Sequence, residues 1–146
     1  MTDNLKFIDT NIFIYSYDSS EQEKHKIAKN ILKKCWLKLE TYAISTQIIS
    51  EFYVNTTKKI QYPIEPEKVE EDIRDILSFE NFKMFEIKRT TISKAINISI
   101  ENKLSYWDSL IAATMQENGI YTIITENERD FKKISWLNII NPFKNQ

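Results

Sequence analysis

Two spacings of apolar residues alternate along this chain, and they predict two kinds of secondary structure. Short apolar runs predict buried strands, whereas apolar residues that recur every three or four positions predict amphipathic helices. Runs typical of strands lie at residues 5–8, 42–45, 121–125 and 137–140, and residues 81–87 alternate like a strand near the edge of a sheet. Strands that alternate with helices predict an α/β fold, in which helices flank a central parallel sheet of four or five strands.

The predicted helices are bounded by residues that favour helix starts and ends. Pro66 suits the first turn of a helix, and Gly119, the only glycine, suits a helix C-terminus. In the stretch 88–103 the apolar residues Ile92, Ile96 and Ile100 fall on one face. The helices are predicted to begin near residue 11 and to cover residues 21–40, 47–59, 66–77, 88–103, 107–118 and 128–135.

Length and charge narrow the class of protein. With 146 residues the chain can bury a core of its own, and we expect a single domain over residues 1–146. Its 20 basic and 21 acidic residues give a net charge of −1, so any nucleic-acid surface would have to be a local patch. The chain shows no signal peptide and no long apolar run, so we expect a cytoplasmic protein.

The composition argues against several kinds of active site. The single cysteine, Cys35, lies in a lysine-rich helical stretch and is expected to be structural, and the single histidine, His25, is expected on an exposed helix surface. Zinc sites and Ser–His or Cys–His nucleophiles therefore fit poorly. One glycine is too few for a phosphate-binding loop. Catalysis would have to use carboxylates.

Four acidic residues stand in short apolar segments, namely Asp9, Glu51, Asp108 and Asp130. Isolated carboxylates are costly to bury, and several brought together without basic partners usually indicate a cation among them. Ligands of parallel sheets bind beyond the carboxyl ends of the strands. Asp9 directly follows one predicted strand and residues 125–127 follow another, so we expect these residues to meet at one edge of the sheet.

Each acid also has an ordinary structural interpretation. Asp9 could cap the helix that follows it, Asp108 could be an N-cap or first-turn acid, and Glu51 could lie on the surface beside an apolar stripe. Asp130 could likewise cap a short helix. Independent caps would have no reason to converge, so it is the combination of the acids that favours a site.

The segments FIDTNIF, SEFYVN, YWDSLIAA and IITENERDF, in this order, resemble the PIN-domain family. More narrowly, they resemble the VapC-type ribonuclease toxins of toxin–antitoxin pairs. The resemblance extends from about residue 5 to residue 140 and implies a PIN-like three-layer sandwich. It also implies an endoribonuclease that hydrolyses RNA phosphodiester bonds and leaves a 5′-phosphate. A small antitoxin partner and a homodimer are implied as well.

The resemblance implies a site that holds one or two Mg²⁺ or Mn²⁺ ions. The residues that match the family's metal ligands are Asp9, Glu51, Asp108 and Asn127, and Asn127 stands where the family usually has an acid. Either Glu126 or Asp130 could supply the missing charge, and we take Asp130 as a catalytic residue together with Asp9, Glu51 and Asp108. Asn11 and Thr125 are expected to bind substrate.

Further residues are candidates for contacts with RNA or with a partner protein. Basic residues that could hold phosphates are Lys58, Lys59, Arg89 and Arg129. Aromatic residues that could stack on bases, with packing as the alternative role, are Tyr15, Tyr17 and Trp107. Aromatic residues that could serve a protein interface are Phe82, Phe85 and Trp136.

Three other functions remain open on the sequence alone. A phosphatase with Asp9 as nucleophile would need a second acid at position 11, where the chain has Asn11. A catalytically weak or inactive PIN-like module that binds RNA or protein is favoured by Asn127. A housekeeping PIN nuclease would share the site and lack the antitoxin.

Overall fold

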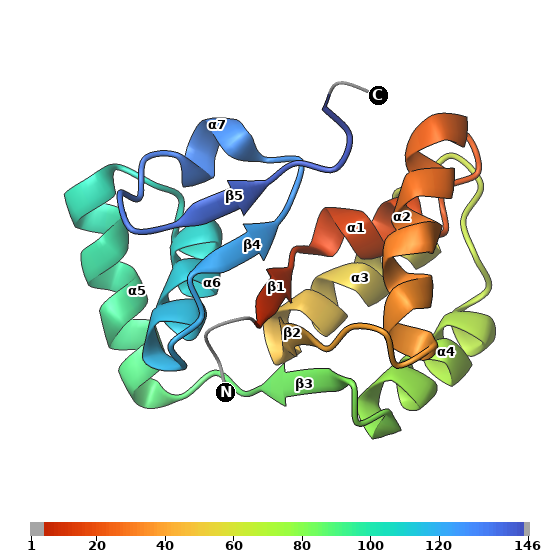
Figure 1. Cartoon of the computed structure of the whole chain (residues 1–146), viewed down its shortest axis with the longest axis horizontal. Helices are drawn as coiled ribbons and strands as arrows, with labels where there is room; N and C mark the ends of the chain where they lie inside the picture. The colour runs from red at the N-terminus through yellow and green to blue at the C-terminus, as the bar shows by residue number, and fades with distance from the viewer. Residues whose placement is uncertain (1–4, 145–146) are drawn as a thin grey trace.

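A computed structural model describes residues 5–144 and forms a five-stranded parallel sheet flanked by helices (Figure 1). This confirms the predicted α/β class and the strand count. In space the strands follow the order β3-β2-β1-β4-β5, and each pairs in parallel with its neighbour. The strands are β1 (Lys6–Ile8), β2 (Tyr42–Ser45), β3 (Phe82–Phe85), β4 (Thr122–Ile124) and β5 (Asn138–Ile140). The strand predicted near an edge, β3, is an edge strand.

Most helices begin and end close to the predicted positions, but the helix predicted over residues 21–40 ends at Trp36. The helices are α1 (Thr10–Tyr15), α2 (Gln22–Trp36), α3 (Thr46–Lys58), α4 (Pro66–Ser78), α5 (Arg89–Asn102), α6 (Tyr106–Glu117) and α7 (Glu128–Phe131). Pro66 is the first residue of α4, and Gly119 takes a φ of 68° just after α6. Both residues thus have the predicted roles.

The last helix, α7, is shorter than predicted. The sequence indicated a helix over residues 128–135, but α7 ends at Phe131. Beyond it the N–H groups of Lys133 and Ile134 bond to carbonyls three residues back, those of Asp130 and Phe131, which tightens the chain into turns. The turns bring Ile134 into the core.

The face of α5 that carries its isoleucines points outward. Ile100 is 72% exposed, and Ile92 and Ile96 are also exposed. The buried side of α5 instead carries Thr91, Ala95 and Ile98. Figure 1 shows α5 lying alongside α6 at one end of the molecule. This side, with the small Ala95, faces α6, so the isoleucines on the opposite face remain outside.

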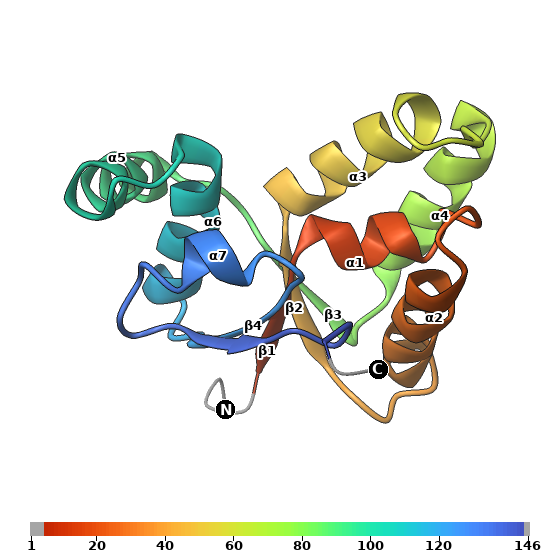
Figure 2. The same ribbon diagram turned by 90° about the horizontal axis from the view of Figure 1, so that it is seen from above.

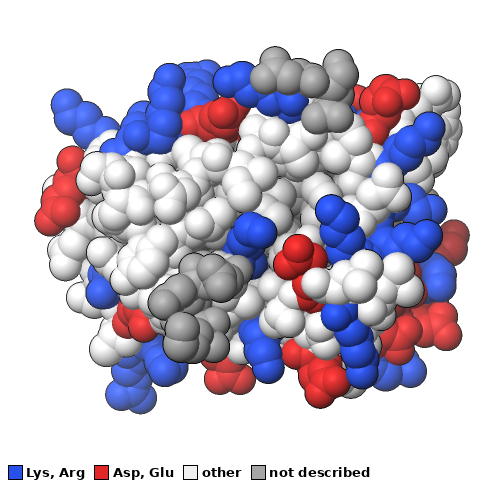
Figure 3. Space-filling view, in the orientation of Figure 1, with Lys and Arg blue, Asp and Glu red and all other residues white. Residues whose placement is uncertain are grey.

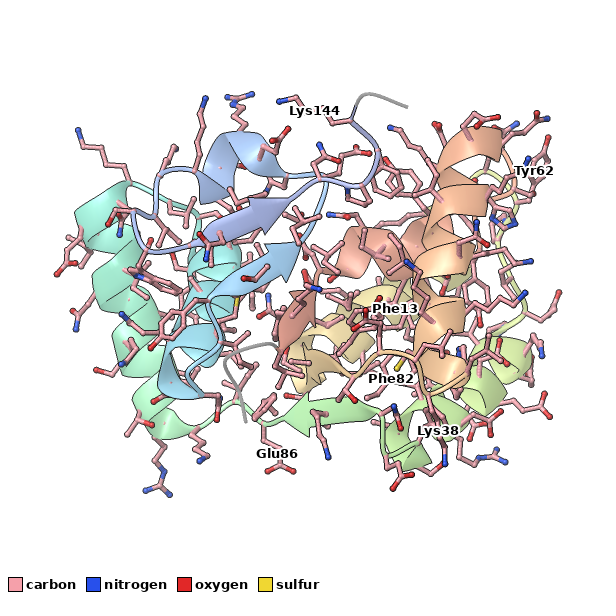
Figure 4. All side chains as sticks on the ribbon, in the orientation of Figure 1. Phe13, Lys38, Tyr62, Phe82, Glu86 and Lys144 are labelled. Carbon is pink, nitrogen blue, oxygen red and sulfur yellow. The ribbon has the colours of Figure 1, made fainter. Side chains whose placement is uncertain are left out.

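A cluster of aromatic rings joins α1, α3 and β3 in the core. The ring of Phe13 lies 5.4 Å from that of Phe52 and 5.9 Å from that of Phe82, centroid to centroid. Figure 4 shows Phe13 and Phe82 inside the molecule, whereas Tyr62 lies at its periphery. The prediction that Phe82 is exposed and serves an interface is therefore wrong, because its ring completes this cluster. Phe85 and Trp136 are partly buried against the core.

The sheet order creates a switch point between β1 and β4. From β1 the chain moves through β2 to β3 on one side, and it later returns to build β4 and β5 on the other side. The segments that leave β1 and β4 therefore diverge, and ligands bind in such places in open α/β sheets. The N–H of Asp9 donates to the carbonyl of Ile124 across a distance of 3.1 Å, which holds the two strand ends together.

The molecular surface carries mixed charge. Basic and acidic side chains are interspersed over the face shown in Figure 3, so this face has no extended field of one sign. Within residues 5–144, no helix has the length and apolar character needed to cross a membrane.

Candidate active site

Asp9 lies at the switch point, where it caps α1. Its Oδ1 accepts a hydrogen bond of 2.7 Å from the Thr10 N–H, and its Oδ2 accepts from Thr125 Oγ1 at 2.7 Å and from Asn11 Nδ2 at 3.1 Å. Asp9 is 6% exposed. The capping role expected for Asp9 is confirmed. The same carboxylate is also buried, and it accepts bonds from donors on both sides of the switch point.

Asn11 and Thr125 form the support around Asp9. The Asn11 amide also donates to Thr125 Oγ1 at 3.1 Å, and Asn11 Oδ1 accepts from the Glu126 N–H at 3.2 Å. Thr125 Oγ1 accepts in addition from the Asn127 N–H at 3.0 Å. These bonds tie the start of α1 to the segment after β4. The two residues predicted to bind substrate thus orient the Asp9 carboxylate.

Glu51 comes to the site from the second turn of α3, a helix that starts near α1 (Figure 2). Its Oε1 accepts a hydrogen bond of 3.0 Å from Thr10 Oγ1, so a single residue of α1 links Glu51 to Asp9. Gln47, one turn before Glu51, is buried, and its Nε2 donates to the Trp107 carbonyl at 3.0 Å. This bond joins α3 to the first turn of α6.

Thr10 and Gln47 were not identified from the sequence. Both carried a usable signal, because each is a polar residue at a position that its helix buries. Gln47 also lies four residues before Glu51 and therefore on the same face of α3.

Asp108 lies in the first turn of α6. Ser105 is the N-cap of this helix and accepts a hydrogen bond from the Asp108 N–H at 3.2 Å. The first-turn role predicted for Asp108 is confirmed. Asp108 is half-buried, whereas the residues that follow it on α6, from Ser109 to Met115, are buried.

The polar residues of the fourth motif, IITENERDF, have different roles in the structure. Asn127 is the N-cap of α7, with Oδ1 accepting from the Asp130 N–H at 3.4 Å, so the suggestion that Asp130 caps this helix is wrong. Glu126 turns away to Lys24, whose Nζ lies 3.0 Å from Oε2, and accepts a bond of 2.9 Å from the Tyr15 hydroxyl. Asp130 remains as the acid of this motif that acts on Asp108.

The carboxylates influence one another. Burial, with smaller contributions from the charges of Asp108 and Glu51, raises the pKa of Asp9 to about 6, and the hydrogen bonds from Thr125 and Thr10 oppose this rise. Burial also raises the pKa of Glu51, with a contribution from Asp108. The pKa of Asp108 is raised by burial and by Asp130, and a hydrogen bond from Asn127 opposes the rise. The charge of Asp108 therefore acts on both Asp9 and Glu51, and the charge of Asp130 acts on Asp108.

A family model agrees with this arrangement, since the model of the PIN domain matches residues 6–137. The chain belongs to the PIN-domain family. The segments that carry the four acids all lie within the matched range, as the sequence resemblance implied. A search of curated proteins finds no match to this PIN domain.

Solved structures share the fold of this PIN domain over nearly its whole length. A toxin–antitoxin complex from Klebsiella pneumoniae contains a chain with a TM-score of 0.64 and 24% identity, and the match covers 94% of this chain and 98% of that one. VapBC2 from Rickettsia felis, bound to a promoter DNA fragment, gives a TM-score of 0.66 at 20% identity, covering 94% and 98%. VapC20 from Mycobacterium tuberculosis, a Sarcin-Ricin loop cleaving toxin, gives 0.69 at 14% identity, covering 90% and 95%. At these identities the likeness establishes the fold.

The donor set of this PIN domain suits a hard divalent ion. Carboxylate and amide oxygens are the ligands that Mg²⁺ and Mn²⁺ prefer, and the mutual repulsion of Asp9, Glu51 and Asp108 would be relieved by a cation. Among the described residues, no group of three or more His, Cys, Asp or Glu side chains is arranged so that it could hold a metal ion. Mg²⁺ does not require one, because it keeps several waters and is commonly bound through one or two carboxylates together with substrate phosphates.

Several other candidates have structural roles. Tyr15 packs edge-on against Phe143 and bonds to Glu126, while Tyr17 packs against Phe52 and donates to Asp72, as the packing alternative predicted. His25 is half-buried rather than exposed, because its Nδ1 lies 2.9 Å from the Tyr15 carbonyl oxygen. Cys35 is buried in the core, as expected of a structural cysteine.

Two candidates keep a place beside the acids. The positive charge of Lys59 lowers the pKa of Glu51 against the effect of burial. Trp107, the residue before Asp108, remains 61% exposed. A cation and an accessible aromatic ring therefore lie at the edge of the acid cluster.

Proposed function

We propose that this PIN domain is a metal-dependent endoribonuclease that hydrolyses RNA phosphodiester bonds. The observation that carries the proposal is the convergence of Asp9 and Glu51 on Thr10 at the switch point, together with the charge of Asp108, which raises the pKa of both carboxylates. PIN domains are nucleases, and a cluster of acids without a histidine or cysteine fits metal-assisted hydrolysis better than nucleophilic catalysis by the protein.

Asp9, Glu51 and Asp108 would hold Mg²⁺ or Mn²⁺, and Asn127 would add a neutral donor through its side-chain amide. A divalent ion in such a site lowers the pKa of a water and offsets charge on the phosphate. Neighbouring side chains of the protein orient these carboxylates. Thr125 and Asn11 fix Oδ2 of Asp9, and Thr10 fixes Oε1 of Glu51. Asp130 supplies the fourth negative charge beside Asp108.

We expect purified protein to cleave single-stranded or loop RNA with Mg²⁺ or Mn²⁺ and not with EDTA. Asp9→Asn and Asp108→Asn should each lower the cleavage rate by roughly a hundredfold or more, since even residues that support metal ligands are typically worth 10–100-fold. Asp75→Asn, a change at an exposed position on α4, is the matched control and should cleave normally. A folded protein that neither cleaves RNA nor binds Mg²⁺ in a titration would instead be an inactive module that binds RNA or protein.

We infer further that the protein is the toxin of a toxin–antitoxin pair, acts with a small antitoxin and forms a homodimer. The support is the likeness of fold to proteins from toxin–antitoxin complexes, which extends over nearly the whole length of both chains.

Expression of the chain alone should arrest bacterial growth, and expression of the Asp9→Asn variant should not. Co-expression of the neighbouring open reading frame should restore growth, and its product should co-purify with the chain. Cells that grow normally while the purified protein cleaves RNA would point to a housekeeping PIN nuclease.

A further inference from the structure

A hollow adjoins the acid cluster at Glu51. It has a volume of about 500 Å³ and lies between α3, the start of α6 and the segment after β3. Its apolar lining includes Val54, Ile87, Trp107 and Leu110, and Glu51 and Lys59 are its charged residues. Ligand sites commonly have volumes of 300–1,000 Å³, with apolar walls and a few polar groups. Glu51 therefore belongs both to this hollow and to the acid cluster.

The ring of Trp107 is exposed, and its backbone and a neighbouring ring restrict its position. At 61% exposure it leaves a large apolar surface in water, and Val54 in the same hollow is exposed as well. The Trp107 carbonyl accepts the 3.0 Å bond from Gln47, and the indole meets the ring of Tyr106 edge-on at 5.1 Å between centroids. A ring held in place before its ligand arrives loses little entropy on binding.

The charges beside the hollow suit a nucleotide better than a purely apolar group. Lys59 is a lining residue and is close enough to Glu51 for its charge to act on that carboxylate. A lysine can pair with a phosphate, while an aromatic ring can stack on any base. When the scissile phosphate of an RNA strand lies at the acids, the adjoining nucleotide offers both a phosphate for Lys59 and a base for Trp107.

We propose that this hollow is a nucleobase subsite for single-stranded RNA, in which one base stacks on Trp107 and the adjoining phosphate pairs with Lys59. The inference rests on the proposed function, because it assumes that RNA crosses the acid cluster. It adds to that function by placing one base of the substrate relative to Glu51.

Abasic scanning of the RNA tests this contact directly. A fluorescent RNA oligomer and variants that each lack one base are titrated with the protein in EDTA, so that binding is measured without cleavage. With the wild type, one abasic position should weaken binding roughly 5- to 150-fold, as expected for loss of one stacked base. Trp107→Ala should weaken binding of the intact RNA by a similar factor and should show no further loss at that position. Trp107→Phe, which keeps a ring, should restore most of the binding.

Tyr121→Ala is the matched control, because Tyr121 is also an exposed aromatic residue but lies before β4 and contacts Trp136. It should bind every RNA as the wild type does. The subsite is ruled out if a folded Trp107→Ala variant binds intact RNA normally. It is also ruled out if this variant still loses affinity at the abasic position by the same factor as the wild type, because the two effects are then independent. If Trp107→Ala instead changes the molecular mass in solution and leaves RNA binding intact, the hollow is an interface between two copies. Metal-dependent cleavage by the wild type is measured separately, so the data can reject the nucleobase subsite and still support the proposed ribonuclease activity.

Discussion

At the scale of single residues, Asp9 shows how hydrogen bonds allow a carboxylate to be buried in the folded protein. Three hydrogen-bond donors satisfy its two oxygens, and none of these donors carries a charge. The hydrogen bonds lower the pKa and burial raises it, and burial has the larger effect, since the pKa of Asp9 is about 6. The folded protein therefore holds a proton on Asp9 that an unfolded chain releases at lower pH.

This difference predicts a pH dependence of stability in the metal-free protein. Because the pKa of Asp9 rises from 3.8 to about 6 on folding, its contribution favours the folded state below pH 4 and is lost as the pH increases to 6. The loss corresponds to about 3 kcal/mol in the free energy of unfolding. The Asp9→Asn variant should show a smaller decrease in the free energy of unfolding between pH 4 and 6, as measured by urea unfolding in EDTA at several pH values.

Glu117→Gln is the control for this titration. The hydrogen bond from Thr91 lowers the pKa of Glu117, so its contribution has the opposite sign and is lost as the pH decreases. The Glu117→Gln variant should retain the fall in stability between pH 4 and 6. An Asp9→Asn variant with the same fall as the wild type would contradict the raised pKa of Asp9.

At the scale of elements, the site depends on how α1 is seated. This helix has only six residues, too few to be stable alone, so its position comes from packing. Phe13 on its inner side meets Phe52 of α3 and Phe82 of β3, while Asp9 and Thr10 at its start contact Thr125 and Glu51. The aromatic core and the acid cluster therefore share one short helix.

Phe13→Ala should lower the free energy of unfolding by about 3–5 kcal/mol, because the ring is 1% exposed and its removal leaves a cavity. Tyr62→Ala removes an aromatic ring that is 58% exposed, and it should change stability by less than about 0.5 kcal/mol. Urea unfolding measures both effects. Similar losses in the two variants would show that the packing around α1 is not what holds it.

At the scale of the whole molecule, the chain has almost no net charge with which to attract RNA. Its net charge is −1, and basic and acidic groups are mixed over the face shown in Figure 3. Recognition must then depend on a few local cations and on stacking, rather than on a long-range field.

RNA binding should accordingly depend only weakly on salt. We expect a plot of log K against log salt concentration with a slope of about −1 to −2, and Lys59→Gln should make the slope shallower by about 0.7, the value for one phosphate contact on a single strand. Lys34→Gln, a change on the exposed side of α2, should leave the slope unchanged. A slope steeper than about −4 for the wild type would reveal a basic surface that these contacts do not include.

The sequence by itself determined the elements and the positions of three acids. Short apolar runs gave the strands to within a residue or two, and Pro66 and Gly119 marked helix ends, because these signals are local. Asp9, Glu51 and Asp108 could be named because each is an acid in an apolar segment. That their segments lie at one edge of the sheet also follows from the α/β pattern, since parallel strands place their carboxyl ends at one edge. The strand order came only from the structure.

Only the tertiary structure decided which neighbours each residue meets. Glu126 and Asp130 are equivalent in the sequence, but Lys24 pairs with Glu126, which leaves Asp130 beside Asp108. Phe82 looked like a surface residue until Phe13 was placed against it, and the isoleucines of α5 point outward because α6 meets the opposite face. These outcomes depend on contacts between segments far apart in the chain. Local sequence propensity cannot predict these contacts, because packing and charge pairing are properties of the assembled fold.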